Sequence, residues 1–158
     1  MLNFSVWVDA DSFPKKARSY ILETASAKSV KVVFVSNHAI ESGSASLIVC
    51  STEHDAADNY IYEHSSYNDI VVTRDILFAA RLVEKKICVM NDRGVIFTQD
   101  NIKDKLCERE FSLNLSDIGL GGSKSNYYGE KELKKFSRTF TEELQKHIIS
   151  DIYNCRLN

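Results

Sequence analysis

Two stretches of this chain are almost wholly apolar and rich in β-branched side chains, and they restrict the fold more than any other feature. Residues 30–35 read Val-Lys-Val-Val-Phe-Val, and residues 70–72 read Ile-Val-Val. A strand with one face in water alternates apolar and polar side chains, whereas a continuous apolar run predicts a strand covered on both faces. Strands of this kind belong to parallel sheets with helices on each side.

Helical patterns separate these strands, and shorter apolar runs at residues 6–8, 47–50 and 87–90 predict further strands. The turn sequence at residues 91–94 predicts a short hairpin at the sheet edge. The alternation indicates an α/β fold, a single-domain three-layer α/β/α arrangement around a mostly parallel sheet. With 158 residues the chain can bury its own core, so one domain over residues 1–158 is expected.

Towards the C-terminus the pattern becomes helical. Asp100 is expected to cap a helix whose apolar stripe contains Ile102, Leu106 and Leu113. The glycine-containing stretch at residues 119–129 is expected to be a flexible segment, and a last helix is expected over about residues 130–150.

The first candidate site follows the strand at residues 6–8, where Asp9 and Asp11 stand one residue apart and Pro14 introduces a helix. Side chains alternate along an extended backbone, so both carboxylates point to the same side and can reach one cation or one phosphate. The alternative is structural: Asp11 or Ser12 caps the next helix.

Two more acidic sites follow. Asp55 and Asp58 are three residues apart at a helix start, which places both carboxylates on one face, although Asp55 also suits a helix cap. Asp75 follows the strand at residues 70–72, in the position that Asp9 has after the first strand. Thr73 can satisfy the strand end, and Arg74 can pair with an acid or contact a phosphate.

The carboxyl ends of parallel strands share one edge of a sheet, which is where ligands bind in α/β folds. The five aspartates are therefore expected to converge there: Asp9, Asp11, Asp55, Asp58 and Asp75. Crowded carboxylates repel one another unless a cation is shared, and such hard oxygen ligands suit Mg²⁺ or Mn²⁺ better than zinc. Two ions roughly 4 Å apart would serve the hydrolysis of a phosphodiester without a nucleophilic side chain.

Asn37 follows the second strand and either binds substrate or closes a turn. With a net charge of −2 and a pI near 6.1, the whole molecule does not attract nucleic acid, so any such contact must be a local patch. The best candidate patch is residues 124–138, where five Lys or Arg, including Lys124, face two Glu.

Four cysteines stand far apart without a C-x-x-C pair, which indicates reduced thiols in a cytoplasmic protein rather than a zinc cage or a disulfide framework. No signal peptide is expected, because Asp9 interrupts the short apolar run at the N-terminus. No stretch approaches the roughly 20 apolar residues of a membrane span.

A set of short motifs resembles the YaiI/YqxD family of bacterial proteins: Val8-Asp9-Ala10-Asp11 with Pro14, Asn37, Asp55-x-Ala57-Asp58-Asn59, Thr73-x-Asp75, Asn91-x-Arg93-Gly94 and Gly121-Gly122. The resemblance runs over nearly the whole chain. That family looks like a branch of the PIN-like group of metal-dependent nucleases, which often act on RNA. The resemblance implies metal ligation by Asp9, Asp11, Asp58 and Asp75, with Asp55 as a further acid and with Asn37 and Thr73 touching ligands or substrate.

Two other functions fit the same residues. In a haloacid-dehalogenase-like phosphatase, Asp9 would be the nucleophile, Asp11 the acid and base, and Thr73 a phosphate contact. That class needs an inserted flap after the first strand, whereas Pro14 begins a helix almost at once, and Phe13 stands where a hydroxyl residue is expected. The other alternative is an RNA- or metal-binding module without catalysis.

Overall fold

The structure is a computed structural model and describes residues 2–121 and 127–158. The strands are β1 (Ser5–Asp9), β2 (Lys31–Ser36), β3 (Ser46–Val49), β4 (Ile70–Val72), β5 (Cys88–Met90) and β6 (Ile96–Phe97). The helices are α1 (Lys15–Ala27), α2 (Ala56–His64), α3 (Ile76–Glu84), α4 (Gln99–Asp117) and α5 (Glu130–Leu157). Of the expected flexible segment at residues 119–129, residues 122–126, including Lys124, lie outside the described residues.

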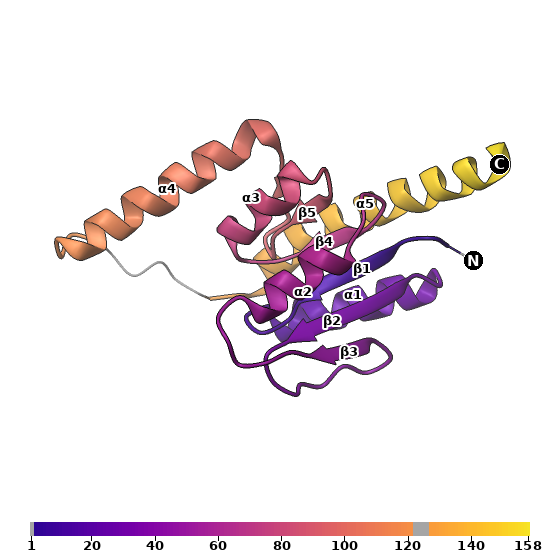
Figure 1. The fold of residues 1–158 in the computed structure, drawn as a ribbon, viewed down its shortest axis with the longest axis horizontal. Helices are drawn as coiled ribbons and strands as arrows, with labels where there is room; N and C mark the ends of the chain where they lie inside the picture. Colours follow the sequence, from indigo (N-terminus) through magenta and orange to yellow (C-terminus); the bar gives the residue numbers. More distant parts are fainter. Residues whose placement is uncertain (1, 122–126) are drawn as a thin grey trace.

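The strands form one sheet in the order β3-β2-β1-β4-β5-β6 (Figure 1). Every neighbouring pair among the first five strands is parallel, and β6 returns antiparallel to β5 through the predicted hairpin. The α/β class and the mostly parallel sheet expected from the apolar runs are therefore confirmed. The sheet order also shows that β1 and β4, far apart in the sequence, are central neighbours.

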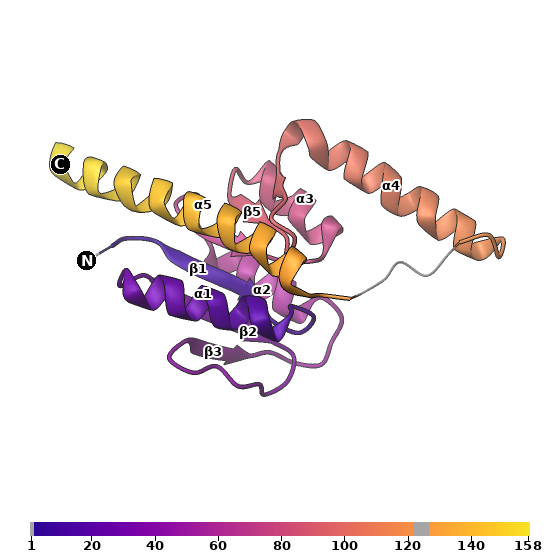
Figure 2. The ribbon, with the colours of Figure 1, turned by 180° about the vertical axis from the view of Figure 1, so that it is seen from behind.

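Helices cover both faces of the sheet. The helices α1 and α5 lie on one face (Figure 2), and α2 and α3 lie on the other (Figure 1). Alternation along β1 divides its side chains between two cores: Val6 and Val8 pack towards α1 and α5, whereas Trp7 packs towards α2 and α3. Burial on both faces explains why these short strands carry almost no polar side chains.

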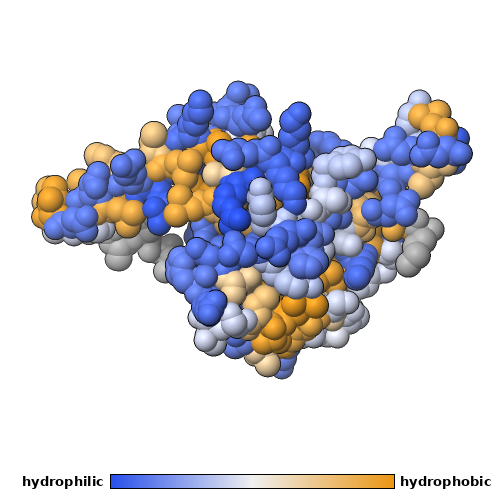
Figure 3. All heavy atoms as spheres, in the orientation of Figure 1, coloured by the Kyte–Doolittle hydropathy of each residue, from blue (hydrophilic) through white to orange (hydrophobic). Residues whose placement is uncertain are grey.

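The long helix α4 projects from the body of the protein (Figure 1). Its expected cap was wrong: Thr98 is the N-cap and forms a reciprocal capping box with Asn101, while Asp100 lies in the first turn. Its expected apolar stripe was also wrong in part, because only Ile102 is buried and Leu113 is 48% exposed. Apolar residues along this helix accordingly show at the surface in Figure 3.

The helix α5 begins at Glu130 and continues to Leu157, beyond the expected end near residue 150. Its buried side chains, Phe136, Phe140 and Leu144, fill the core beside α1. No helix among the described residues combines the length and the apolar character needed to cross a membrane.

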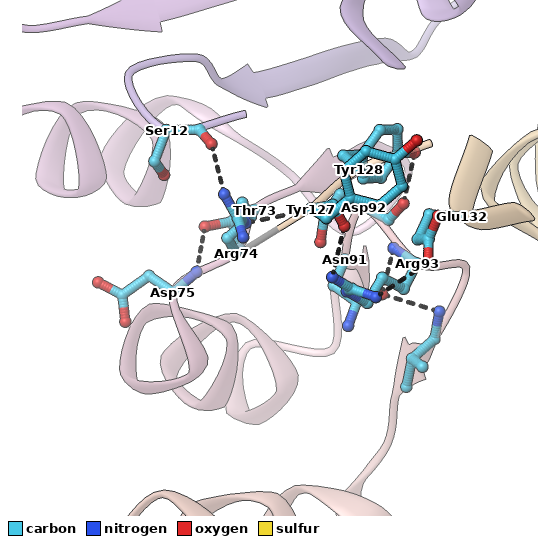
Figure 4. A network of polar contacts seen from close by, with 11 residues as sticks. Ser12, Thr73, Arg74, Asp75, Asn91, Asp92, Arg93, Tyr127, Tyr128 and Glu132 are labelled. Atoms are coloured by element: carbon cyan, nitrogen blue, oxygen red, sulfur yellow. Dashed lines mark hydrogen bonds and ion pairs between the residues drawn. The ribbon is translucent and has the colours of Figure 1, made fainter. Parts of the chain in front are cut away.

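Two contacts attach the start of α5 to the turn after β5. Tyr128 Oη donates a hydrogen bond of 2.7 Å to the carbonyl of Asp92 (Figure 4), and Thr139 Oγ1 donates one of 2.9 Å to the carbonyl of Gly94. Gly94 has a φ of +76°, and a Cβ at this position would lie 2.5 Å from the carbonyl oxygen of Lys135. Only glycine allows the turn to approach the helix so closely.

Candidate metal centre

The chain order reverses across the sheet between β1 and β4. From β1 the chain moves to β2 and β3 on one side, and it then returns to β4 on the other side. In open α/β sheets such a reversal leaves a crevice outside the carboxyl ends of the strands. Asp9 ends β1 and Thr73 follows β4 at this position, and Thr73 Oγ1 donates a hydrogen bond of 2.8 Å to Asp9 Oδ2.

Asp9 and Asp58 form the buried part of the acidic site. Asp58 lies in the first turn of α2, and its carboxyl group lies close enough to that of Asp9 for each to change the pKa of the other. Burial is the main reason that the pKa of Asp9 rises to about 6, and repulsion from Asp11 and Asp75 adds to it. Burial, followed by repulsion from Asp9, Asp75 and Asp55, raises the pKa of Asp58 to about 8.

Asp58 also belongs to a group of three carboxylates. Asp55, Asp58 and Asp75 each offer one oxygen, and the three oxygens lie within 4.8 Å of one another. These residues come from the starts of α2 and α3, which follow β3 and β4 at the same edge of the sheet. The convergence of acids that the sequence predicted is therefore present for these three side chains, and Asp9 is a neighbour of Asp58.

Asp55 and Asp75 both stand at the N-cap of a helix, but only the side chain of Asp75 forms a capping hydrogen bond. Asp55 stands at the N-cap of α2, but its backbone is left-handed, with a φ of 61°, and its side chain makes no capping hydrogen bond. Its carboxylate instead pairs with His54 Nδ1 at 2.8 Å. Asp75 does cap α3, because its Oδ1 accepts a hydrogen bond from the Phe78 N–H. A carboxylate has two oxygens, so this cap leaves Asp75 Oδ2 for another partner.

Asp11 turns towards the loop after β2 rather than towards the group of three. Its carboxylate accepts hydrogen bonds from Ser36 Oγ and from the backbone N–H of Asn37, and it contacts His38 Nδ1 at 3.2 Å. Asp11 does not cap α1, whose N-cap is Pro14 without a side-chain hydrogen bond. Asp11 is nevertheless close enough to Asp9 to raise the pKa of that carboxyl group.

Asn37 has two different environments. Its backbone N–H is bound by Asp11, whereas its side-chain Oδ1 is buried and has no hydrogen-bond partner within residues 2–121 and 127–158. Together with Asp9, Asp11, Asp55 and Asp58, it lines a hollow of about 350 Å³. Glu53 and His54 line the same hollow, and the sequence analysis did not select them, since a loop before a helix carries no periodic signal.

A larger cleft of about 650 Å³ adjoins the acidic group. Asp55, Asp58 and Asp75 line it together with Arg74, Arg81 and Arg109, so it carries both signs of charge. Arg81 donates a hydrogen bond of 3.0 Å to Asn59 Oδ1 and lies 4.4 Å from the centre of the Tyr62 ring. Sequence reasoning missed Arg81 and Arg109, because each is an ordinary helical residue until α3 and α4 pack beside each other.

Arg74 connects three loops at the same edge (Figure 4). Its Nη1 donates a hydrogen bond of 3.1 Å to the carbonyl of Ser12, and its Nε lies 3.2 Å from Asp92 Oδ2. The second contact is an ion pair without the alignment of a hydrogen bond. Of the two roles open for Arg74 in the sequence, pairing with an acid is the one seen here.

The comparisons with known proteins identify the family. Residues 7–146 match the family model described as "Uncharacterized BCR, YaiI/YqxD family". The chain belongs to the YaiI/YqxD family. Among its relatives are UPF0178 proteins of Treponema denticola, 41% identical over 89% of this chain and 92% of that protein, and of Psychromonas ingrahamii, 34% identical over 90% and 96%. The UPF0178 protein of Treponema pallidum is 32% identical over 90% of this chain and 82% of its own length. No solved structure matches the chain.

Proposed function

We propose that this YaiI/YqxD protein is a Mg²⁺- or Mn²⁺-dependent nuclease of PIN-like type that hydrolyses phosphodiester bonds in single-stranded RNA. The observation that carries the proposal is the meeting of Asp55, Asp58 and Asp75, whose oxygens lie within 4.8 Å of one another. The family description names no activity, so the proposal depends on the geometry and on the resemblance to PIN-like nucleases.

The donor set fits a hard divalent cation. It consists of carboxylate oxygens, which Mg²⁺ and Mn²⁺ prefer, and cysteine and histidine do not belong to the group of three. The buried pair of Asp9 and Asp58 has raised pKa values, which means that its negative charge is poorly compensated by the protein alone. When bound, such an ion would polarise a phosphodiester oxygen and lower the pKa of a water molecule.

The surrounding residues support this chemistry by holding groups in place. Thr73 donates to Asp9 and accepts from the Asp75 N–H at 3.0 Å, so one hydroxyl orients two acids. Arg81 and Arg109 line the same 650 Å³ cleft as the acids and supply positive charge there. A strand of RNA can thus place one phosphate at the carboxylates while neighbouring phosphates meet the arginines.

The geometry favours a nuclease over the phosphatase alternative. Asp9 would be the nucleophile of a phosphatase, yet it is only 7% exposed and its carboxylate accepts a hydrogen bond from Thr73. Residues 10–14 are all that separate β1 from α1, which leaves no room for an inserted flap. Phe13, at the position where that class needs a hydroxyl, is buried in the core.

The test compares three substrates with and without Mn²⁺: single-stranded RNA, single-stranded DNA and a phosphomonoester. The wild-type protein is expected to cut RNA only with the metal, and Asp58→Asn is expected to lower the rate by at least about 10–100-fold, the loss that follows even when an outer partner of a metal ligand is removed. Asp104→Asn, an exposed aspartate on α4, is the matched control and should retain full activity. Cleavage of the monoester alone would indicate a phosphatase, and RNA binding without cleavage would indicate a non-catalytic module.

A further inference from the structure

Arg18, in the first half of α1, is half-buried, and two of its guanidinium nitrogens have no hydrogen-bond partner. Its Nε and Nη1 atoms are shielded from solvent, and neither forms a hydrogen bond within the described residues. A buried donor without an acceptor costs roughly 1–3 kcal/mol, and more when it is charged, so native proteins rarely contain one. The described side chains therefore supply no acceptor to these two nitrogens.

Arg18 is among the residues that line a pocket of about 200 Å³ on the α1 side of the sheet, and its Nε and Nη1 atoms lie shielded beneath the pocket surface. The pocket lies between α1, β2 and the loop from residue 37 to residue 45, which Figure 2 shows passing beside α1. Its lining residues are Lys15, Arg18, Ser19, Leu22, Phe34, Glu41 and Gly43. At Gly43, with a φ of +54°, a Cβ would lie 3.3 Å from Leu22 Cδ1, so a glycine lets the loop close over the helix.

The charges of the pocket favour an anion. Two cations, Lys15 and Arg18, face a single carboxylate, that of Glu41. Glu41 Oε2 pairs with Lys15 Nζ at 3.0 Å, and this pairing, helped by the nearby Arg18 charge, lowers the pKa of Glu41, but Arg18 Nε and Nη1 form no hydrogen bond within the described residues. Both members of that ion pair are mostly exposed, at 74% and 85%, and exposed pairs of this kind contribute little to stability. Glu41 can therefore move aside at little cost when a stronger anion enters.

The backbone at the start of α1 also favours an anion in the pocket. Lys15 is the first residue of α1, where the free N–H groups of a helix carry partial positive charge, and Arg18 follows one turn later, its own N–H bonded to the Pro14 carbonyl. No acidic side chain occupies that turn to neutralise it. Basic residues at this end of a helix are unfavourable unless an anion accompanies them.

We propose that the pocket around Arg18 binds a phosphate group. A phosphate carries close to two negative charges near neutral pH and offers several acceptor oxygens, so it can engage both cations while Glu41 swings into solvent. A carboxylate, with one charge, has no such advantage over the Glu41 carboxylate already present. This site is separate from the acidic group and does not depend on a bound metal or on nuclease activity.

The pocket and the acidic site share one structural element, the loop that follows β2. Asp11 binds the start of this loop at Asn37, and Lys15 binds its middle at Glu41. Both sites thus contact the loop that leaves the carboxyl end of β2. A phosphate at the end of a nucleic-acid strand and a free phosphate ion would present the same chemistry to Arg18.

The test is a calorimetric titration of inorganic phosphate into the full chain in the presence of EDTA. Arg18→Gln is expected to weaken binding by at least about tenfold, the loss that corresponds to one charged hydrogen bond. Lys16→Gln is the matched control, because Lys16 is on the same turn but pairs with Glu130 at 3.6 Å and does not line the pocket. It should bind phosphate as the wild type does.

A second variant keeps the test valid if loss of Arg18 disturbs folding. Glu41→Gln changes an exposed loop residue and is expected to tighten phosphate binding several-fold, since it removes the competing carboxylate. Equal affinity of Arg18→Gln and wild type, weaker binding by Glu41→Gln, or no binding by the wild type at about 10 mM phosphate would overturn the proposal.

RNA oligonucleotides distinguish a phosphate at the end of a strand from a free phosphate ion. The measurements are made in EDTA, which prevents the proposed metal-dependent cleavage. Tighter binding of a 5′-phosphorylated strand than of its 5′-hydroxyl form, with the difference lost in Arg18→Gln, would support a strand end as the ligand. Equal binding of the two strands, together with Arg18-dependent binding of inorganic phosphate, would support the free ion. Failure of metal-dependent cleavage would leave both results intact, because neither requires catalysis.

Discussion

The Thr73 hydroxyl donates a 2.8 Å hydrogen bond to Asp9 Oδ2 and thereby joins the ends of the two central strands, β1 and β4. The same oxygen accepts the backbone N–H of Asp75 at 3.0 Å. One buried side chain therefore positions two members of the acidic site. Its loss should affect both stability and the ionisation of Asp9.

Thr73→Val is expected to destabilise the fold by roughly 1–3 kcal/mol, since it removes the hydrogen bonds that this hydroxyl makes to the buried Asp9 carboxylate and the half-buried Asp75 N–H. The lost hydrogen bond to Asp9 also raises the pKa of that carboxyl group further, because Thr73 now lowers it. Metal-dependent activity should then require a higher pH. Urea unfolding and a pH–rate profile measure the two effects, and Thr73→Ser, which keeps the hydroxyl, should show neither.

The acidic site makes stability depend on pH when no metal is present. The pKa values of Asp9 and Asp58, about 6 and about 8, both exceed the ordinary value of 3.8, so the folded protein holds these protons more tightly than the unfolded chain. The resulting stabilisation is complete below pH 3.8 and is lost as the pH rises through about 6 and then about 8.

In EDTA, the melting temperature of the wild type should therefore fall relative to that of Asp58→Asn as the pH rises towards 8. Each kcal/mol lost corresponds to roughly 2–4 °C for a domain of this size. Mn²⁺ should restore the melting temperature of the wild type at high pH and have little effect on that of the variant. Parallel melting curves for the two proteins across the pH range would contradict the expected repulsion.

Arg109 is expected to contact a backbone phosphate of the bound RNA. It is exposed on α4 and lines the cleft beside the acids. Arg109→Gln should weaken RNA binding and reduce the slope of log K against log salt by about 0.7, the value for one single-strand phosphate contact. Lys103→Gln, an exposed neighbour on α4 outside the cleft, should change neither quantity. Binding can be measured by fluorescence anisotropy at several salt concentrations.

Gly94 and Gly119 provide a matched pair for backbone packing. Both have a left-handed backbone, with φ of +76° and +77°, so alanine costs about 1–2 kcal/mol at either position. At Gly94 a Cβ also meets the Lys135 carbonyl at 2.5 Å, whereas at Gly119 no atom lies within 4 Å. Overlap of the added Cβ with the Lys135 carbonyl should add about 1–3 kcal/mol to the loss of stability in Gly94→Ala. Equal denaturation midpoints for the two variants would contradict this prediction and show that α5 can shift away from the added Cβ at little cost.

The alternation of elements and the location of the acids at strand ends and helix starts followed from the sequence. Continuous apolar runs such as residues 70–72 specify strands buried on both faces, and that burial requires helices on each side. In a parallel sheet, all carboxyl ends share one edge, so Asp9 and Asp75 had to lie on it. The α4 stripe was misjudged because local periodicity does not reveal whether a helix has anything to pack against.

Only the tertiary structure decided which of these acids meet. Asp55, Asp58 and Asp75 come together because the sheet order places the starts of α2 and α3 at one edge, whereas Asp11 turns away to bind the Asn37 N–H. These outcomes depend on loop backbones and long-range packing, such as the left-handed conformation at Asp55, and no periodic pattern encodes them. The sequence thus determined the chemistry available at the sheet edge, and the packing of distant segments determined its geometry.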